Sequence, residues 1–258
     1  GHRRTVREHT YADRMEQTAE ILRRHLSYRS EERALPAPDL STVSYGHTLI
    51  RPEDVNPKLT TAWQSEAIPL RQRALVQQEL KRMYQGRVPA LFQVLSDCMK
   101  PYLSNGCTVL ETGCASGYYY EVLEYLSSKR IRYTGVDYSE PLISMAKSHY
   151  PSARFKVADG SRLPFKDREV TIVVSGGVLL HVPNYAEHIA ESCRVAKRIV
   201  VAHRTPVCRN TPTRYLKKFG YGVEMVELVF NEKEILSIFS ANGMELVKSV
   251  ETASNTSQ

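Results

Sequence analysis

The segment CTVLETGCASGYYYEVL, at residues 107–123, constrains this 258-residue chain most, because it has the pattern of a strand, a glycine-bearing turn and a helix. Residues 107–110 have the apolar, partly β-branched character of a buried parallel strand, and helical spacing resumes after Gly117. Gly113 and Gly117 let the backbone turn sharply and let a ligand lie against the main chain, because neither carries a Cβ. A loop in this position is where an open α/β sheet binds its ligand.

Strand and helix patterns alternate along the rest of the chain, which predicts a doubly wound, mostly parallel α/β sheet of seven strands. Five strands are expected at 107–111, 131–136, 153–158, 169–175 and 197–203, with helices at 117–128, 139–149 and 184–194. The two remaining strands are expected at 223–230 and 244–250, on either side of a helix that ends at Gly243. Residues 204–222 are predicted to be an irregular insertion.

An N-terminal helical region precedes this sheet. Amphipathic patterns predict helices over 11–34, 65–84 and 88–102, and a loop rich in Pro, Ser and Thr runs from residue 35 to about residue 60. We therefore expect two domains: a helical cap over residues 1–104 that walls the substrate site, and a cofactor-binding domain over residues 105–258.

The spacing of the glycines distinguishes between two kinds of cofactor. A dinucleotide fingerprint reads G-x-G-x-x-G, whereas this loop reads E-x-G-x-x-x-G, with Ala115 where that fingerprint has its second glycine. A pyrophosphate is therefore the weaker fit. Asp137 ends the second predicted strand, where a carboxylate can accept hydrogen bonds from a ribose diol. Asp159 and Gly160 end the third, where a carboxylate beside backbone amides can hold an adenine.

The order of these motifs resembles the class I S-adenosylmethionine-dependent methyltransferases, in particular the small stand-alone bacterial enzymes often called type 11. The resemblance covers residues 107–203 and is carried by ETGCASG (111–117), VDYS (136–139), ADGSRLPF (158–165) and EVTIVVSGGVLLHV (169–182). It implies a Rossmann-like fold, S-adenosylmethionine as the cofactor, and methyl transfer to an oxygen or nitrogen of a small molecule. It implies cofactor contacts for Glu111, Gly113, Cys114, Gly117, Asp137, Tyr138, Asp159, Gly160 and Ser175.

Two histidines are candidate general bases under this resemblance. His181 follows the fourth strand in a loop that lines the family's active sites, and its titration near neutrality suits proton transfer. A histidine that packs beside the cofactor is an equal alternative. His203, at the end of the fifth strand, is the second candidate, and a structural hydrogen bond is the alternative for it. We expect Trp63, the only tryptophan, and Tyr118 to shape the acceptor site.

The segment after the fifth strand is basic. It carries Arg204, Arg209, Arg214, Lys217 and Lys218 with no acid among them. Guanidinium groups bind carboxylate and phosphate through paired hydrogen bonds. An anionic acceptor, such as a sugar nucleotide or a carboxylated metabolite, would suit these arginines, and a solvated surface loop is the alternative.

Composition excludes several other classes. The net charge of +7 is divided almost evenly between the two halves of the chain, so no nucleic-acid surface is expected. The longest apolar runs are too short to span a bilayer, and five irregularly spaced cysteines without a C-x-x-C pair favour free thiols in the cytoplasm. Magnesium-binding acids and the Asn/Asp-Pro-Pro-Tyr cluster of amine-methylating enzymes are both missing, so no metal is expected. Homo-oligomerisation is left open.

Two other functions compete with methyl transfer. A nucleotide-sugar oxidoreductase or epimerase would use a Tyr-x-x-x-Lys pair, which occurs as Tyr125 and Lys129. That pair lies in the helix directly after the glycine loop, too close to the phosphate end to reach a nicotinamide. A non-catalytic methyltransferase-like module would have no need of the cofactor carboxylates, yet Glu111, Asp137 and Asp159 are all present.

Overall fold

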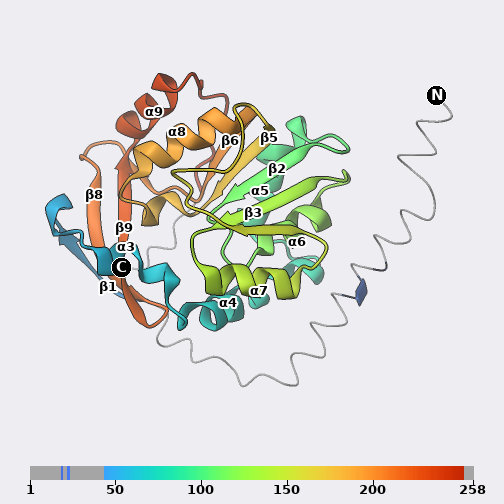
Figure 1. Ribbon diagram of the computed structural model, residues 1–258, viewed down its shortest axis with the longest axis horizontal. Helices are drawn as coiled ribbons and strands as arrows, with labels where there is room; N and C mark the ends of the chain where they lie inside the picture. The colour runs from blue at the N-terminus through green and yellow to red at the C-terminus, as the bar shows by residue number, and fades with distance from the viewer. Residues whose placement is uncertain (1–18, 20–21, 24–43, 253–258) are drawn as a thin grey trace.

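The computed structural model describes Ala19, Leu22, Arg23 and residues 44–252. The helix predicted over 11–34 lies outside this part, apart from those first three residues, which are helical. Two sheets lie side by side in Figure 1: a parallel sheet at the centre of the chain and a smaller sheet formed by segments from both ends. No helix in the described part of the chain is long and apolar enough to cross a membrane.

The parallel sheet contains the five strands predicted in the centre of the chain. Its strands are β2 (Thr108–Thr112), β3 (Arg132–Asp137), β4 (Arg154–Val157), β5 (Val170–Gly176) and β6 (Ala196–His203), in the order β4-β3-β2-β5-β6. The connecting helices are α6 (Tyr118–Leu126), α7 (Glu140–His149) and α8 (Tyr185–Val195). All neighbouring strands run in parallel, so their carboxyl ends lie at one edge. The predicted Rossmann-like fold class is confirmed.

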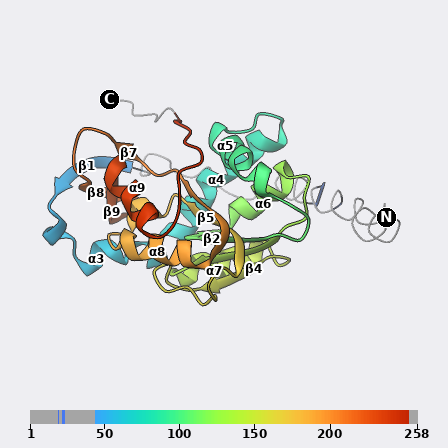
Figure 2. The same cartoon turned by 90° about the horizontal axis from the view of Figure 1, so that it is seen from above.

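Helices cover both faces of this sheet. Val109 and Ile172 belong to the main core cluster under α4 (Ile68–Tyr84), α5 (Ala90–Met99), α6 and α7. Their neighbours Leu110 and Val173 face the other way and pack with Val195 of α8, since successive strand residues point to opposite faces. Figure 2 shows α5 and α6 on one side of the sheet and α8 on the other.

The second sheet corrects two predictions. Its strands are β1 (Ser44–Ile50), β7 (Val207–Cys208), β8 (Arg214–Gly220) and β9 (Val223–Asn231), in the order β1-β8-β9-β7. The loop expected up to residue 60 therefore contains β1, and the insertion expected at 204–222 contains β7 and β8. β1 has no local partner that would reveal it, because it pairs antiparallel with β8, which lies far away in the sequence.

The seven-stranded sheet is also corrected, because the parallel sheet has five strands in the part of the chain that the structure describes. β9 pairs with β8 through a two-residue turn at Tyr221 and Gly222, both with positive φ, as in the tight turns of hairpins. Residues 244–250, the seventh strand in the prediction, form no ladder, and Leu246 and Val247 are exposed. An apolar run alone predicts a strand but does not say which sheet it joins.

Short helices complete the fold. They are η2 (Pro52–Asp54), α3 (Pro57–Thr60), η3 (Ala62–Gln64), η4 (Lys100–Tyr102), η5 (Leu179–His181) and α9 (Glu232–Ala241). We refer to residues 57–65, which include α3 and η3, as the cover segment. The boundary expected between residues 104 and 105 stays a prediction, although β1 and β8 pair across it.

Glu121 of α6 ties three helices together inside the core. Its buried carboxylate accepts hydrogen bonds from Tyr84 Oη of α4 at 2.8 Å and from Tyr150 Oη, just after α7, at 2.5 Å. Arg73 Nη1 donates to the Tyr150 hydroxyl at 2.8 Å. Buried polar groups are costly unless their partners remain in place.

We expect Glu121→Gln to lower the free energy of unfolding by about 1–2 kcal/mol, because the amide presents an N–H₂ group to a hydroxyl that needs an acceptor. Chemical denaturation monitored by circular dichroism measures this loss. Glu187→Gln, at an exposed position of α8, is the control and should leave the free energy of unfolding unchanged. Equal stabilities of the two variants would contradict the role assigned to Glu121.

Candidate functional site

The glycine-bearing loop after β2 is fixed by β3. Gly113, Ala115 and Gly117 all have positive φ, and Gly117 is the N-cap of α6. The backbone N–H of Cys114 donates to Val136 O at 3.0 Å, and that of Ala115 donates to Asp137 Oδ2 at 2.9 Å. The loop and the end of β3 are therefore one rigid unit at the carboxyl edge of the sheet.

The space beside the two glycines is used by the protein itself. A Cβ on Gly113 would lie 2.3 Å from Val178 Cβ, and one on Gly117 would lie 2.6 Å from Phe155 Cε1. The absence of a Cβ was expected to make room for a ligand, but the side chains of Val178 and Phe155 occupy this space instead. At Gly113, the close contact with Val178 packs the loop after β2 against the loop after β5.

This contact leads to a prediction for Gly113→Ala. The new Cβ would clash with Val178 at a backbone conformation that alanine disfavours, so we expect the affinity for S-adenosylmethionine to fall about tenfold. Isothermal titration calorimetry measures the affinity. Gly177→Ala is a matched control, since Gly177 also has positive φ but no neighbour closer than 3.4 Å to a Cβ. Adding Val178→Ala to the Gly113 variant should recover part of the loss, and failure to do so would contradict the clash.

Asp137 is the best-defined polar group of this edge. Its side chain is 6% exposed, and Oδ1 and Oδ2 accept backbone N–H bonds from Ser139 and Ala115, each at 2.9 Å. Burial raises the pKa of this carboxyl to about 6, against the opposite effect of these hydrogen bonds. Each carboxylate oxygen keeps a lone pair for a further donor, such as a ribose hydroxyl.

Glu111 and Cys114 lie deeper. Glu111 is 1% exposed and accepts a hydrogen bond from the Tyr133 hydroxyl, and burial holds its pKa well above the usual range. The Cys114 thiol is fully buried, and burial raises its pKa as well. A thiol of this kind is a poor nucleophile. In this arrangement Cys114 can meet a cofactor through its backbone only.

The other predicted cofactor residues border the same edge. Asp159 is exposed, and its Oδ1 accepts from the N–H and Oγ of Ser161 at 2.8 and 2.7 Å. Gly160 lies against His188, whose ring would be 2.2 Å from a Cβ there. Ser175 is the last residue but one of β5, and Tyr138 follows β3. The Tyr138 hydroxyl donates to Thr60 O of the cover segment at 3.0 Å.

Orphaned hydroxyls at this edge test whether S-adenosylmethionine fits. Ser139 Oγ and Ser175 Oγ are buried without a hydrogen-bond partner among the described residues. Together with the spare lone pairs of Asp137 they suit a ligand rich in hydroxyl, amino and carboxylate groups. The donor set therefore fits this cofactor.

His181 and Trp63 meet beside this edge. His181 Nδ1 lies 3.0 Å from Val226 O of β9, and since a carbonyl only accepts, Nδ1 carries the proton. In the neutral ring Nε2 is then the acceptor. Burial lowers the pKa of His181, which keeps the ring neutral near pH 7. The Trp63 ring of the cover segment lies 4.9 Å from the His181 ring, centroid to centroid.

His203 is placed differently. It is 5% exposed, and its Nε2 lies 3.0 Å from the Tyr119 hydroxyl. Burial lowers its pKa to about 4. With Nε2 already in a hydrogen bond, His203 is the weaker candidate for the base.

The structure does not gather the predicted arginines. Arg204 donates to the Tyr118 hydroxyl at 3.2 Å, so these two residues adjoin. Arg209 is ion-paired with Glu232 and Glu251. Arg214 begins β8, about 20 Å along the strand from the hairpin turn at Tyr221. Arg204 alone of the three therefore stays close to the candidate site.

Sequence reasoning missed Glu79 and Tyr221. Burial raises the pKa of both side chains, and electrostatic interaction with Arg204 opposes this rise, so both lie near this cation. Tyr221 also lies 5.4 Å from Trp63, centroid to centroid. Gly222, directly before the strand predicted at 223–230, is a turn signal that could have been used. Glu79 has no comparable signal, because it is one polar residue of an amphipathic helix.

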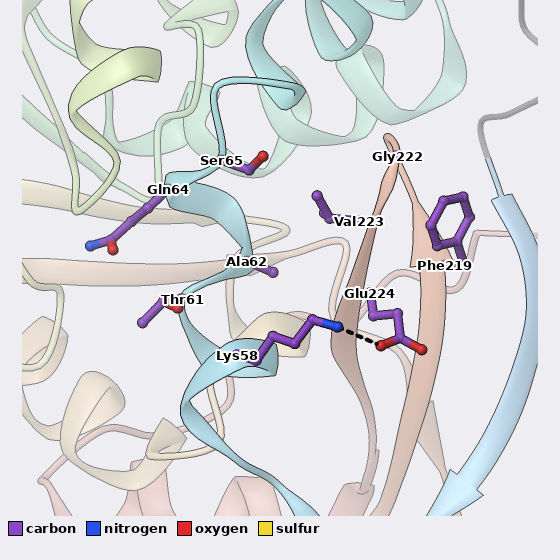
Figure 3. A pocket seen from close by; sticks show the side chains of 9 residues that line it. All are labelled: Lys58, Thr61, Ala62, Gln64, Ser65, Phe219, Gly222, Val223 and Glu224. Carbon is purple, nitrogen blue, oxygen red and sulfur yellow. Dashed lines mark hydrogen bonds and ion pairs between the residues drawn. The ribbon is translucent and has the colours of Figure 1, made fainter.

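A cleft of about 640 Å³ opens between the cover segment and the β8–β9 hairpin. Figure 3 shows its two walls, with Thr61 and Gln64 on one side and Phe219 and Gly222 on the other. Lys58 Nζ lies 3.2 Å from Glu224 Oε2, so an ion pair bridges the cleft. In the described part of the chain, no group of three or more His, Cys, Asp and Glu side chains could hold a metal ion.

Comparison with known proteins identifies the central part of the chain. Residues 110–199 match the family model of a methyltransferase domain. A probable S-adenosylmethionine-dependent methyltransferase of Mycolicibacterium smegmatis is 29% identical over 92 residues, which are 36% of this chain and 35% of that protein. The chain thus matches about a third of this relative's length. The resemblance inferred from the motifs is confirmed for this segment.

One solved structure supports the fold. A chain of the complex between the Haloferax volcanii Trm112 methyltransferase activator and a methyltransferase superposes with a TM-score of 0.54 at 17% identity, covering 75% of this chain and 80% of that one. At this identity the likeness shows the fold alone. A Bacillus halodurans protein described as a methyltransferase gives a TM-score of 0.47 at 18% identity, covering 60% of this chain and 70% of that one.

Proposed function

We propose that this chain, whose residues 110–199 form a class I methyltransferase domain, transfers a methyl group from S-adenosylmethionine to an oxygen or nitrogen of a small-molecule acceptor. One observation carries the proposal. Asp137 lies in the rigid unit of loop and strand end that would hold an adenosyl group, and His181, a neutral base, follows β5 at the same edge. We also propose that the acceptor is anionic, as expected from the sequence, and that Arg204 binds it. We place the activity in the cytoplasm, in line with five free cysteines.

Each part of the site has a task under this proposal. Asp137 accepts hydrogen bonds from the ribose, Asp159 and the amide of Gly160 bind the adenine edge, and Ser175 Oγ donates to the amino-acid portion. When bound there, the cofactor would supply an electrophilic methyl group to the acceptor. His181 Nε2 takes the proton that the acceptor loses. The cover segment excludes water, because Tyr138 holds it against the end of β3.

Calorimetry with S-adenosylmethionine and with NAD tests the cofactor. We expect binding of the first only, and formation of S-adenosylhomocysteine when a metabolite extract is added. Binding of NAD would support the oxidoreductase alternative, although the ring of Tyr125, its candidate catalytic residue, packs 4.9 Å from Tyr84 beside the core. Binding without turnover would support the non-catalytic module.

A further inference from the structure

We propose that the acceptor attacks through a hydroxyl oxygen and that the indole N–H of Trp63 selects it. This inference rests on the proposed methyl transfer and narrows it from oxygen or nitrogen to oxygen. It starts from two polar atoms on adjoining rings: Trp63 Nε1 and His181 Nε2.

Trp63 Nε1 is buried, and none of the described residues accepts a hydrogen bond from it. A buried N–H without a partner is rare, because it loses water and gains nothing. An acceptor atom of a ligand would satisfy it. The cover segment that carries Trp63 forms one wall of the cleft, and its neighbours Ala62 and Gln64 are among the lining residues.

The ring of Trp63 contacts two other rings. His181 contacts it at 4.9 Å and Tyr221 at 5.4 Å between centroids, and these residues come from the loop after β5 and from the β8–β9 turn. Tyr221 has a φ of 53°, as the two-residue hairpin turn requires. Arg71 of α4 donates to Tyr221 O at 2.7 Å and holds this turn.

An N–H donor on one ring and a nitrogen acceptor on the adjoining ring are together complementary to a hydroxyl. Its oxygen has two lone pairs, so one can accept from Trp63 Nε1 while the other attacks, and its proton can go to His181 Nε2. The O–H bond breaks toward the imidazole, and the C–O bond forms as the C–S bond breaks. A neutral amine has a single lone pair, which cannot both accept from Trp63 and attack. An ammonium group has none.

Trp63→Phe tests this assignment without a known acceptor, because it removes the N–H and keeps an aromatic ring at the position that contacts His181 and Tyr221. We expect a melting temperature equal to or a few degrees above that of the wild type, since no buried N–H is left unpaired. We expect unchanged affinity for S-adenosylmethionine and at least tenfold slower transfer of label to a small-molecule extract. Trp63→Ala should melt lower. A Trp63→Phe variant that melts as low as Trp63→Ala would overturn the proposal, because the N–H would then have a partner in the protein.

The product identifies the attacking atom. With ¹³C-methyl-labelled cofactor and the matched probes glucose 6-phosphate and glucosamine 6-phosphate, or 4-hydroxybenzoate and 4-aminobenzoate, added to the extract, we expect labelled O-methyl products only. A labelled N-methyl product would overturn the oxygen assignment and leave the proposed methyltransferase intact. Failure to bind the cofactor at all would instead remove the proposed function, and the two failures are therefore distinguishable.

Discussion

His181→Ala should lower turnover about 10²–10⁴-fold while the affinity for S-adenosylmethionine stays the same, because the variant loses the base and no cofactor contact. The geometry supports this expectation. Val226 O fixes the proton on Nδ1, and Nε2 is left as the acceptor in a ring whose pKa burial lowers. Single-turnover rates with saturating cofactor measure the effect. Near-normal rates would reassign His181 to packing.

His181→Asn separates the two roles. The asparagine amide can keep the hydrogen bond to Val226 O, since its nitrogen occupies a position similar to Nδ1, but it supplies no base. If His181 only packs, the asparagine variant should recover most of the rate. If Nε2 takes the proton, the asparagine variant should be as slow as the alanine variant.

The pH dependence follows from the lowered pKa of His181. The base must be neutral to accept a proton, so its active form is present above the folded-state pKa and is lost as pH falls through it. Because this pKa lies below 6.5, the His181 limb of the rate profile should lie on the acid side of 6.5. A rate that instead rises toward acid pH would exclude His181 as the base.

Much of the parallel sheet could be predicted from sequence, because its information is local. The strand ending at Asp137 and the turn at Gly113 each show their type within a few residues. Of the small sheet, the sequence predicted the strand at 223–230 but not its partners, since β1 is defined by its pairing with β8, for example Leu49 with Leu216. The strand predicted at 244–250 is wrong for a related reason. An apolar run predicts a strand even where no neighbouring strand is available to pair with it.

The candidate site, like the fold, could be predicted only in part from the sequence. Strand-end position predicted where Asp137 and His181 would lie, because carboxyl ends of parallel strands share an edge. It did not predict what the side chains touch. The contact of Val178 with Gly113 and the bond of His203 to Tyr119 both depend on tertiary packing. The sequence shows that Trp63 is the only tryptophan, but its ring contact with His181 depends on the fold of the cover segment.

Asp137→Ala should weaken the binding of S-adenosylmethionine by about 1–3 kcal/mol, because a charged hydrogen-bond partner of the ribose is lost together with the bond that fixes Ala115. Isothermal titration calorimetry measures this change. Asp97→Ala, at an exposed position of α5, is the control and should bind normally. Affinity that is unchanged in the Asp137 variant would show that the ribose lies elsewhere.

The raised pKa of Asp137 makes both stability and binding depend on pH. The folded, cofactor-free protein holds this proton more tightly than the unfolded chain, with a pKa of about 6 against 3.8, so its contribution to stability falls as pH rises through that interval. Ribose hydroxyls donate to the ionised form, so affinity for the cofactor should increase as pH rises through about 6 and then level off. Asp137→Asn removes the titrating group and should flatten both profiles. A wild-type affinity that does not change between pH 5 and pH 7 would mean that the bound cofactor does not contact this carboxylate, because occupation of its lone pairs must shift its proton equilibrium.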